Sequence, residues 1–173
     1  RVVAVDAPED VAFDDRGRLY AGGEDGVIYR TVDPVTGDAV DADVEAFATV
    51  DGRPLGVEFR GEDLLVAATD AGLQSVAPDG TVETLVASAG GRAVAYADDV
   101  HVADDGTVWV TDATVHDVYM DELFELRDTG RLLRYDPDAD ETTVALTDLG
   151  FANGVAPGPD GDSLLVTETA RYR

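Results

Sequence analysis

The stretch Ala97-Asp98-Asp99-Val100-His101-Val102, followed by the turn Asp105-Gly106 and by Val108-Trp109-Val110, has the pattern of two short strands joined by an acidic glycine turn. The same pattern recurs in the same register in three other segments, which begin at Pro8, Pro54 and Ala152. Equivalent positions are separated by 46, 43 and 55 residues. Because a repeat of roughly 40 to 50 residues is typical of a propeller blade, the sequence predicts an all-β fold of the β-propeller class.

Each repeat contains two further apolar stretches, so that four short strands joined by glycine and aspartate turns make one blade. We predict a single propeller domain with blades at about residues 8–52, 53–95 and 96–150 and a partial blade at 151–173. Three and a half blades would leave blade faces unburied, whereas propellers close with about 4 to 8 blades. We therefore expect closure by the remainder of the propeller in a longer protein, or by another copy of the chain.

The third repeat is lengthened by an insertion at about residues 114–128. Apolar residues recur there at helical spacing behind Asp117, a residue type suited to capping a helix N-terminus. The insertion therefore predicts one short helix. Two roles stay open for this helix: packing over an adjacent loop, or forming a lid near the mouth of the central channel.

The charge of the chain excludes some partners and suggests an environment. Among 173 residues, 37 acidic side chains stand against 12 basic ones, all arginine, which gives a net charge of −25. A nucleic-acid partner would require the opposite sign, and no apolar run is long enough for a membrane span. High salt would screen such self-repulsion, so we expect a salt-adapted protein and slightly favour a high-salt cytoplasm. An acidic surface that binds cations or basic partners is the alternative.

Six runs of sequence, spread over essentially the whole chain, point to one known group of proteins. The runs are Pro8-Glu9 through Phe13-Asp14, Arg53-Pro54-Leu55-Gly56, Tyr96-Ala97-Asp98-Asp99-Val100, Trp109-Val110-Thr111-Asp112-Ala113, Gly130-Arg131-Leu132-Leu133-Arg134-Tyr135-Asp136-Pro137, and Phe151-Ala152-Asn153-Gly154-Val155 with Val166-Thr167-Glu168-Thr169. In order and spacing they resemble strictosidine-synthase-like proteins, a group of six-bladed propellers related to gluconolactonase, regucalcin and paraoxonase. The resemblance implies six blades in the full protein, of which roughly two lie outside this chain.

The same resemblance implies a site at one mouth of the channel, often around a calcium ion. The family's first-blade carboxylate falls on Glu9, its third-blade asparagine on Asp98 and its fourth-blade asparagine on Asn153. Asp98 departs from the usual asparagine, although a carboxylate oxygen is still a ligand that calcium accepts. Leu55 replaces the second-blade histidine of the paraoxonase type, so that enzyme's acid/base pair is not carried over. A catalytic base would come from the fifth or sixth blade.

Geometry alone also favours these positions, because residues from several blades converge where the inner strands begin. Glu9, Asp98 and Asn153 offer oxygen ligands, which suit Ca²⁺ and suit zinc poorly. The alternatives are an exposed acid at Glu9 and a turn dipeptide at Asn153-Gly154. Asp99 and His101 are weaker, catalytic candidates, since His101 lies two residues along the same strand face and is as well explained as a structural histidine.

With these residues as ligands, the family resemblance implies a calcium-dependent hydrolase of small-molecule esters or lactones, with its site at the mouth of the propeller channel. Two other functions stay open. One is a metal-free condensing enzyme of the strictosidine synthase type, and the other is a noncatalytic propeller that binds a ligand. Fold alone does not decide among them, because propellers carry many functions.

Overall fold

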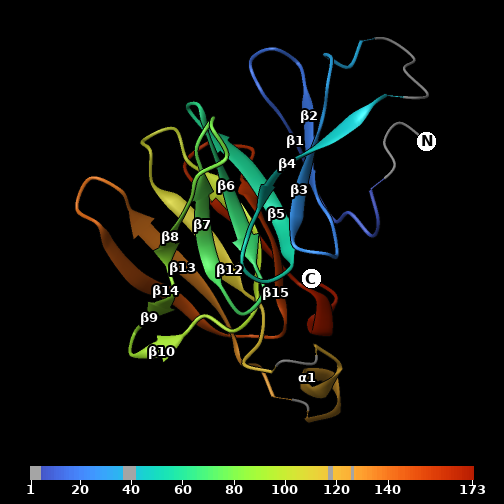
Figure 1. Cartoon of the computed structure of the whole chain (residues 1–173). Coiled ribbons are helices and arrows are strands. Elements are labelled where there is room, and N and C mark those ends of the chain that lie inside the picture. The colour runs from blue at the N-terminus through green and yellow to red at the C-terminus, as the bar shows by residue number, and fades with distance from the viewer. Residues whose placement is uncertain (1–4, 37–41, 117–118, 126) are drawn as a thin grey trace.

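The computed structural model describes residues 5–36, 42–116, 119–125 and 127–173. It contains three four-stranded antiparallel sheets and two two-stranded ones, of which the smaller is the hairpin of β9 (Ser88–Ala89) and β10 (Arg92–Ala93); the other four sheets lie side by side (Figure 1). The first sheet holds β1 (Val11–Phe13), β2 (Leu19–Gly22), β3 (Val27–Thr31) and β4 (Val44–Thr49). The second holds β5 (Pro54–Arg60), β6 (Asp63–Ala68), β7 (Gly72–Val76) and β8 (Val82–Val86). The third holds β11 (Ala97–Val102), β12 (Val108–Asp112), β13 (Gly130–Asp136) and β14 (Glu141–Leu149), and the last holds β15 (Ala152–Pro157) and β16 (Leu164–Glu168).

In each of the four blade sheets, the first strand is the innermost one. β5 lies against β1 on one side and β11 on the other, and β11 in turn lies against β15, although no two of these strands share a sheet. This is the arrangement of successive propeller blades around a channel. The predicted all-β propeller, with about three and a half blades in this chain, is therefore confirmed.

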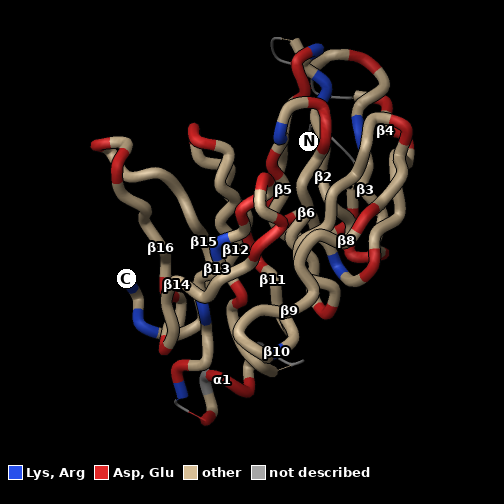
Figure 2. The backbone as a smooth tube through the Cα atoms, turned by 90° about the vertical axis from the view of Figure 1, so that its left-hand side faces the viewer, with Lys and Arg blue, Asp and Glu red and all other residues tan. Residues whose placement is uncertain are grey.

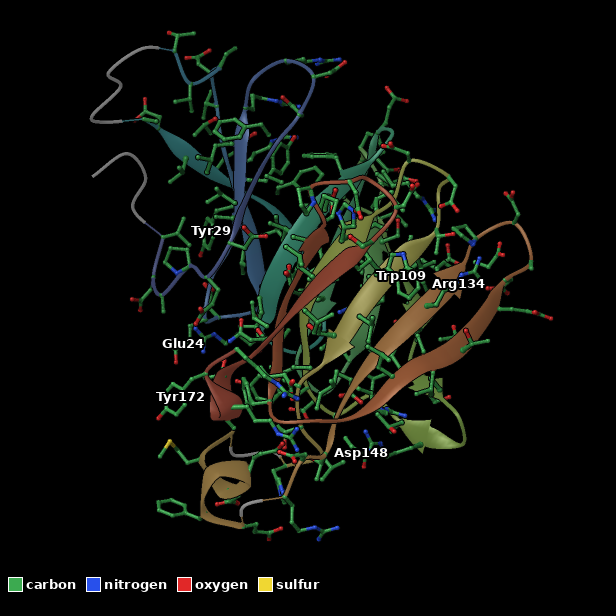
Figure 3. The ribbon with its side chains drawn as sticks, turned by 180° about the vertical axis from the view of Figure 1, so that it is seen from behind. Glu24, Tyr29, Trp109, Arg134, Asp148 and Tyr172 are labelled. Carbon is green, nitrogen blue, oxygen red and sulfur yellow. The ribbon has the colours of Figure 1, made fainter. Side chains whose placement is uncertain are left out.

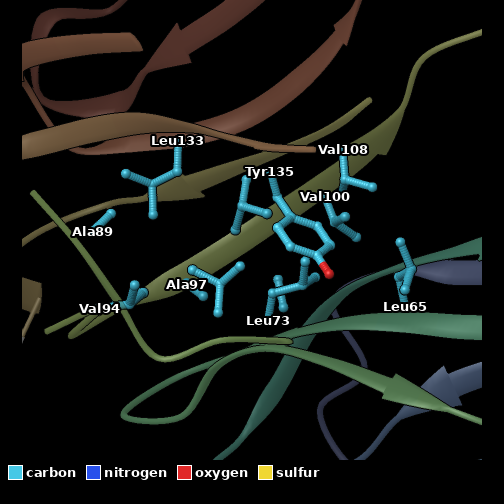
Figure 4. Packing of buried hydrophobic residues seen from close by; sticks show 12 residues of the cluster. Leu65, Leu73, Ala89, Val94, Ala97, Val100, Val108, Leu133 and Tyr135 are labelled. Atoms are coloured by element: carbon cyan, nitrogen blue, oxygen red, sulfur yellow. The ribbon is translucent and has the colours of Figure 1, made fainter. Parts of the chain in front are cut away.

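The core consists of apolar layers between neighbouring blades, and β6 shows how the sequence builds them. Alternate residues of a strand point to opposite faces of the sheet. Leu64 and Val66 accordingly pack towards the first blade, whereas Leu65 and Ala67 pack towards the third. The layer between the second and third blades also includes Val100, Val108, Leu133 and Tyr135 (Figure 4). A strand buried on both faces explains why β6 has no polar residue after its first position.

The opposite face of the third sheet carries larger, less buried side chains. His101, Trp109 and Arg134 lie opposite one another on three adjacent strands, and Figure 3 shows Trp109 and Arg134 side by side. Trp109 is half-buried.

A buried ion pair fixes the third blade to the segment before it. Arg131 is 5% exposed and Asp112 is fully buried, and the Arg131 Nε donates to Asp112 Oδ2 at 2.9 Å. Arg131 also donates to the main-chain oxygen of Ala89, in the small hairpin of β9 (Ser88–Ala89) and β10 (Arg92–Ala93). The second oxygen of Asp112 accepts the N–H groups of Ala95 and Tyr96 at 3.1 and 3.0 Å. Burial is tolerable for this pair because both charges are satisfied.

The insertion in the third blade contains one short helix, α1 (Tyr119–Glu125). The expected cap, Asp117, lies outside the described residues. Because Asp112 pairs with Ala97, the segment that carries α1 leaves the sheet at the end where the inner strands begin (Figure 1). Glu122, which is 1% exposed, anchors the helix there, accepting hydrogen bonds from Thr114 Oγ1 at 2.7 Å and from the Phe151 N–H at 3.2 Å. No helix in the described part of the chain has the length and apolar character to cross a membrane.

Candidate functional site

The same irregularity occurs at the start of three inner strands. In β11, Ala97 pairs with Asp112 and Val100 with Val110, so three steps on one strand match two on the other. β5 and β15 shift register in the same way, between Pro54 and Val57 and between Ala152 and Val155. Each shift is a β-bulge, which re-aims side chains and frees backbone groups from the ladder. The residues at 55–56, 98–99 and 153–154 thus lie in bulges at the start of their inner strands.

The bulges and the segment before β1 surround one cavity of about 420 Å³. Apolar side chains, Leu55 among them, form part of its wall. Acidic residues are spread over the turns at both ends of the blades (Figure 2), but here they converge from three blades. The cavity therefore brings together all three predicted metal ligands and the candidate Asp99. Its polar lining residues are Glu9, Asp10, Glu58, Asp98, Asp99 and Asn153.

Asp98 is the most perturbed of these groups. Its carboxylate accepts no hydrogen bond within the described part of the chain. Burial disfavours the charged form and, together with the nearby negative charges of Asp99 and Glu9, raises the pKa of Asp98 to about 7, while Arg53 acts in the opposite direction. A positive charge placed beside this carboxylate would favour its charged form and so lower its pKa again. Asp98 is thus a carboxylate for which the fold supplies no adequate counter-charge.

Glu9 has a partner of its own. Arg53 Nη2 lies 3.1 Å from Glu9 Oε1 and also donates to the main-chain oxygen of Ala7 at 3.2 Å. The Glu9 side chain is 56% exposed, so this ion pair is screened by solvent and weak. Arg53 ties the segment before β1 to the start of β5, a contact between blades that the sequence did not predict.

Asn153 lies inside β15 rather than in a turn, so the turn interpretation of Asn153-Gly154 is wrong. Asn153 is exposed, and its main-chain oxygen accepts a hydrogen bond from Thr111 Oγ1 at 2.7 Å. Gly154 donates its N–H to Thr167 Oγ1 at 2.7 Å. Asn153 is therefore held by its backbone, and it is one of the residues that line the cavity.

The remaining carboxylates of the cavity are bound to backbone. Asp99 accepts the N–H groups of Val100 and Val155, both at 2.8 Å, and burial raises its pKa. Burial also raises the pKa of Glu58, which sequence reasoning missed. His101 is not among the residues that line the cavity; its Nδ1 lies 3.3 Å from Glu58 Oε2. The signal for Glu58 was a single charged residue within the otherwise apolar run from Pro54 to Phe59.

The oxygen atoms that line the cavity are of the kind that bind a hard cation, but the acidic side chains alone do not form a complete metal site within the described residues. Asp98, Glu9 and Asn153 supply carboxylate and amide oxygens, the ligands that Ca²⁺ prefers. Within the described residues, no three His, Cys, Asp or Glu side chains are close enough together to hold a metal ion. An ion would thus need Asn153 and further oxygens, and it would compete with Arg53 for Glu9.

Comparison with known proteins agrees with this architecture. Residues 98–173 match the model of the strictosidine synthase family, and residues 4–31 match that of the N-terminal part of strictosidine-synthase-like proteins. Protein STRICTOSIDINE SYNTHASE-LIKE 7 of Arabidopsis thaliana is 38% identical over 174 residues, which cover 96% of this chain and 46% of the relative. The chain spans about half the length of the curated relatives it matches.

Among solved structures, a gluconolactonase of Xanthomonas campestris superposes with a TM-score of 0.74 at 20% identity, over 95% of this chain and 55% of its own. A calcium-binding protein, regucalcin, of Agrobacterium tumefaciens superposes with a TM-score of 0.61 at 20% identity, over 92% of this chain and 52% of its own. At 20% sequence identity, the likeness to these two structures shows a shared fold and nothing more. Together with the two family models and the plant relatives, it leads to one assignment: the chain belongs to the strictosidine-synthase-like family of β-propeller proteins.

Proposed function

We propose that the cavity at the channel mouth is part of an active site that hydrolyses esters or lactones with the help of bound calcium. The observation that carries the proposal is Asp98, a carboxylate without a hydrogen-bond partner in the described structure, whose surroundings raise its pKa to about 7. Such perturbed groups concentrate at functional sites. The names of two structural neighbours, a gluconolactonase and a calcium-binding regucalcin, point to the same chemistry.

Asp98 and Asn153 would hold the ion, with Glu9 joining them after leaving Arg53. A calcium ion bound there would polarise the carbonyl group of the substrate and stabilise the oxyanion that forms when water attacks. The water-activating base is expected in blades beyond this chain.

The residues of this chain prepare the site in two ways. Asp98 holds a proton below about pH 7 and gives it up when a positive charge approaches, so cation uptake at pH 6 releases close to one proton. Leu55, Val57 and Val100 line the apolar side of the cavity and reduce the water around the acyl group of a substrate.

The test is a calcium titration by calorimetry, using the full-length protein in high salt at pH 8. Wild type should bind with micromolar affinity, and Asn153→Ala and Glu9→Ala should each weaken binding, whereas the exposed turn variant Asp104→Asn should not. Hydrolysis of aryl esters and lactones should then depend on calcium. Absence of calcium binding in wild type would end the metal-hydrolase proposal and favour a metal-free condensing enzyme, and binding without turnover would favour a noncatalytic propeller.

A further inference from the structure

The inner strands of neighbouring blades are connected at the channel by carboxylates that accept backbone N–H groups. The strands belong to separate sheets, so the edge N–H groups facing the channel have no ladder partner. In each of the three interfaces between blades, a carboxylate of one inner strand accepts such an N–H from the next. The distances are 3.0 Å from Val57 to Asp10, 2.9 Å from Val102 to Glu58 and 2.8 Å from Val155 to Asp99.

The second interface shows that space decides which residue makes the connection. In the second blade, Gly56 is the counterpart of Asp99, which lies in the bulge of β11, and of Asp10, which directly precedes β1. A Cβ on Gly56 would lie 2.6 Å from the Cα of Asp99, so no side chain fits there. The connection is made instead by Glu58, two residues further along β5, whose longer side chain reaches the next strand. The carboxylate-to-backbone contact thus recurs at all three interfaces although different residues make it, which indicates that the contact itself matters.

At the third interface, a second link runs beside the first. The Asp99 N–H donates to Thr111 Oγ1 at 2.9 Å, and the Thr111 hydroxyl donates onward to the main-chain oxygen of Asn153 at 2.7 Å. Asp99 Oδ2 holds the Val155 N–H on the other side of Gly154. The hydrogen bonds to the Asn153 oxygen and to the Val155 N–H hold the bulge of β15 at both ends. They fix its position relative to Asp98, the residue before Asp99.

We propose that Asp99 and Thr111 are positioning residues of the channel-mouth site, which set the distance between Asp98 and Asn153. This inference rests on the proposed function in one respect, namely that the ligand of the site is a calcium ion. It replaces the catalytic role considered for Asp99, because both oxygens of that carboxylate are occupied by N–H groups. Thr111 is fully buried and is not among the residues that line the cavity, so it acts on the site through the backbone of Asn153.

Thr111→Val is the decisive variant, because it removes the hydroxyl without changing size or charge. Substitutions of groups that orient metal ligands typically lower affinity 10- to 100-fold, and we expect about tenfold weaker calcium binding. Thr111→Ser, which keeps the hydroxyl, should restore affinity to within about twofold. Thr31→Val is the matched control: Thr31 is also fully buried and accepts the Leu19 N–H at 3.1 Å, but in the first blade, away from the cavity.

Unchanged affinity in Thr111→Val, or an equal loss in Thr31→Val, would overturn the positioning role while leaving the proposed function intact. If wild type binds no calcium, hydrogen exchange decides the matter independently. The N–H of Asp99 should then exchange about tenfold faster in Thr111→Val, and that of Val155 about tenfold faster in Asp99→Asn. Unchanged exchange at both amides would refute the two links.

Discussion

Replacing Asp98 with asparagine should stabilise the protein at alkaline pH while it weakens cation binding. The pKa of Asp98 rises from 3.8 to about 7 on folding, chiefly through burial and then through Asp99 and Glu9. Below pH 3.8 both the folded and the unfolded states hold the proton, so Asp98 contributes nothing. Between pH 3.8 and 7 the unfolded chain loses its proton first, so the free energy of unfolding falls as the pH rises and stays low above 7.

The size of the effect follows from the shift. A change of about 3 pKa units corresponds to about 4 kcal/mol at most, and contact with solvent reduces it. We expect Asp98→Asn to gain about 1 to 3 kcal/mol at pH 8, because the neutral amide fits the same space without a charge to desolvate. At pH 5 the folded carboxyl already holds its proton, so the gain should be less than half as large. Each kcal/mol raises Tm by about 2 to 4 °C in a domain of roughly 150 to 250 residues, and by about 1 to 2 °C in a full-length propeller of about twice that size.

Thermal unfolding of the full-length protein, followed by circular dichroism in high salt with a calcium chelator, measures this gain at pH 5 and pH 8. Asp104→Asn, at an exposed turn position, is the control for loss of one negative charge. Wild type and Asp98→Asn of equal stability at pH 8, or a gain of the same size at both pH values, would show that Asp98 is not strained by its surroundings.

Three further outcomes are expected. Arg131→Met should cost about 3 kcal/mol in urea unfolding, because the buried carboxylate of Asp112 would keep only the longer, 3.5 Å contact with Arg92; a loss under about 1 kcal/mol would contradict this. Glu122→Ala should expose the insertion at 114–128 to limited proteolysis before the blades unfold, whereas simultaneous digestion would speak against a local anchor. Raising KCl from about 0.1 to 2 M should raise Tm, since the net charge of −25 is then screened; a constant Tm would refute salt adaptation.

The sequence predicted the fold and the point where polar residues of successive blades meet, because both repeat. Alternation of apolar residues and the recurrence of the segment at Ala97 locate the inner strands, and equivalent positions in successive blades must meet around one axis. The family resemblance and this geometry together singled out Glu9, Asp98 and Asn153, and these residues line one cavity. Their roles as ligands stay predictions.

The contacts between blades were beyond sequence reasoning. Arg53 reaches Glu9 across 44 positions, and Asp99 reaches Val155 across 56, distances at which local pattern carries no information. The same limit applies to Asn153-Gly154. This dipeptide is typical of a turn, but it lies in β15, where a bulge accommodates its irregular backbone within the ladder. Local propensity was overridden there by pairing with β16.

The bulge at the start of β5, β11 and β15 has an evolutionary consequence. It confines irregular backbone to two positions in each of these blades, after which the regular ladder resumes and the alternating apolar pattern is undisturbed. The second blade has leucine and glycine at these positions, the third has two acids, and the fourth has asparagine and glycine. Within the space that a neighbouring blade leaves, a propeller built in this way can diversify its chemistry while its scaffold stays under separate selection.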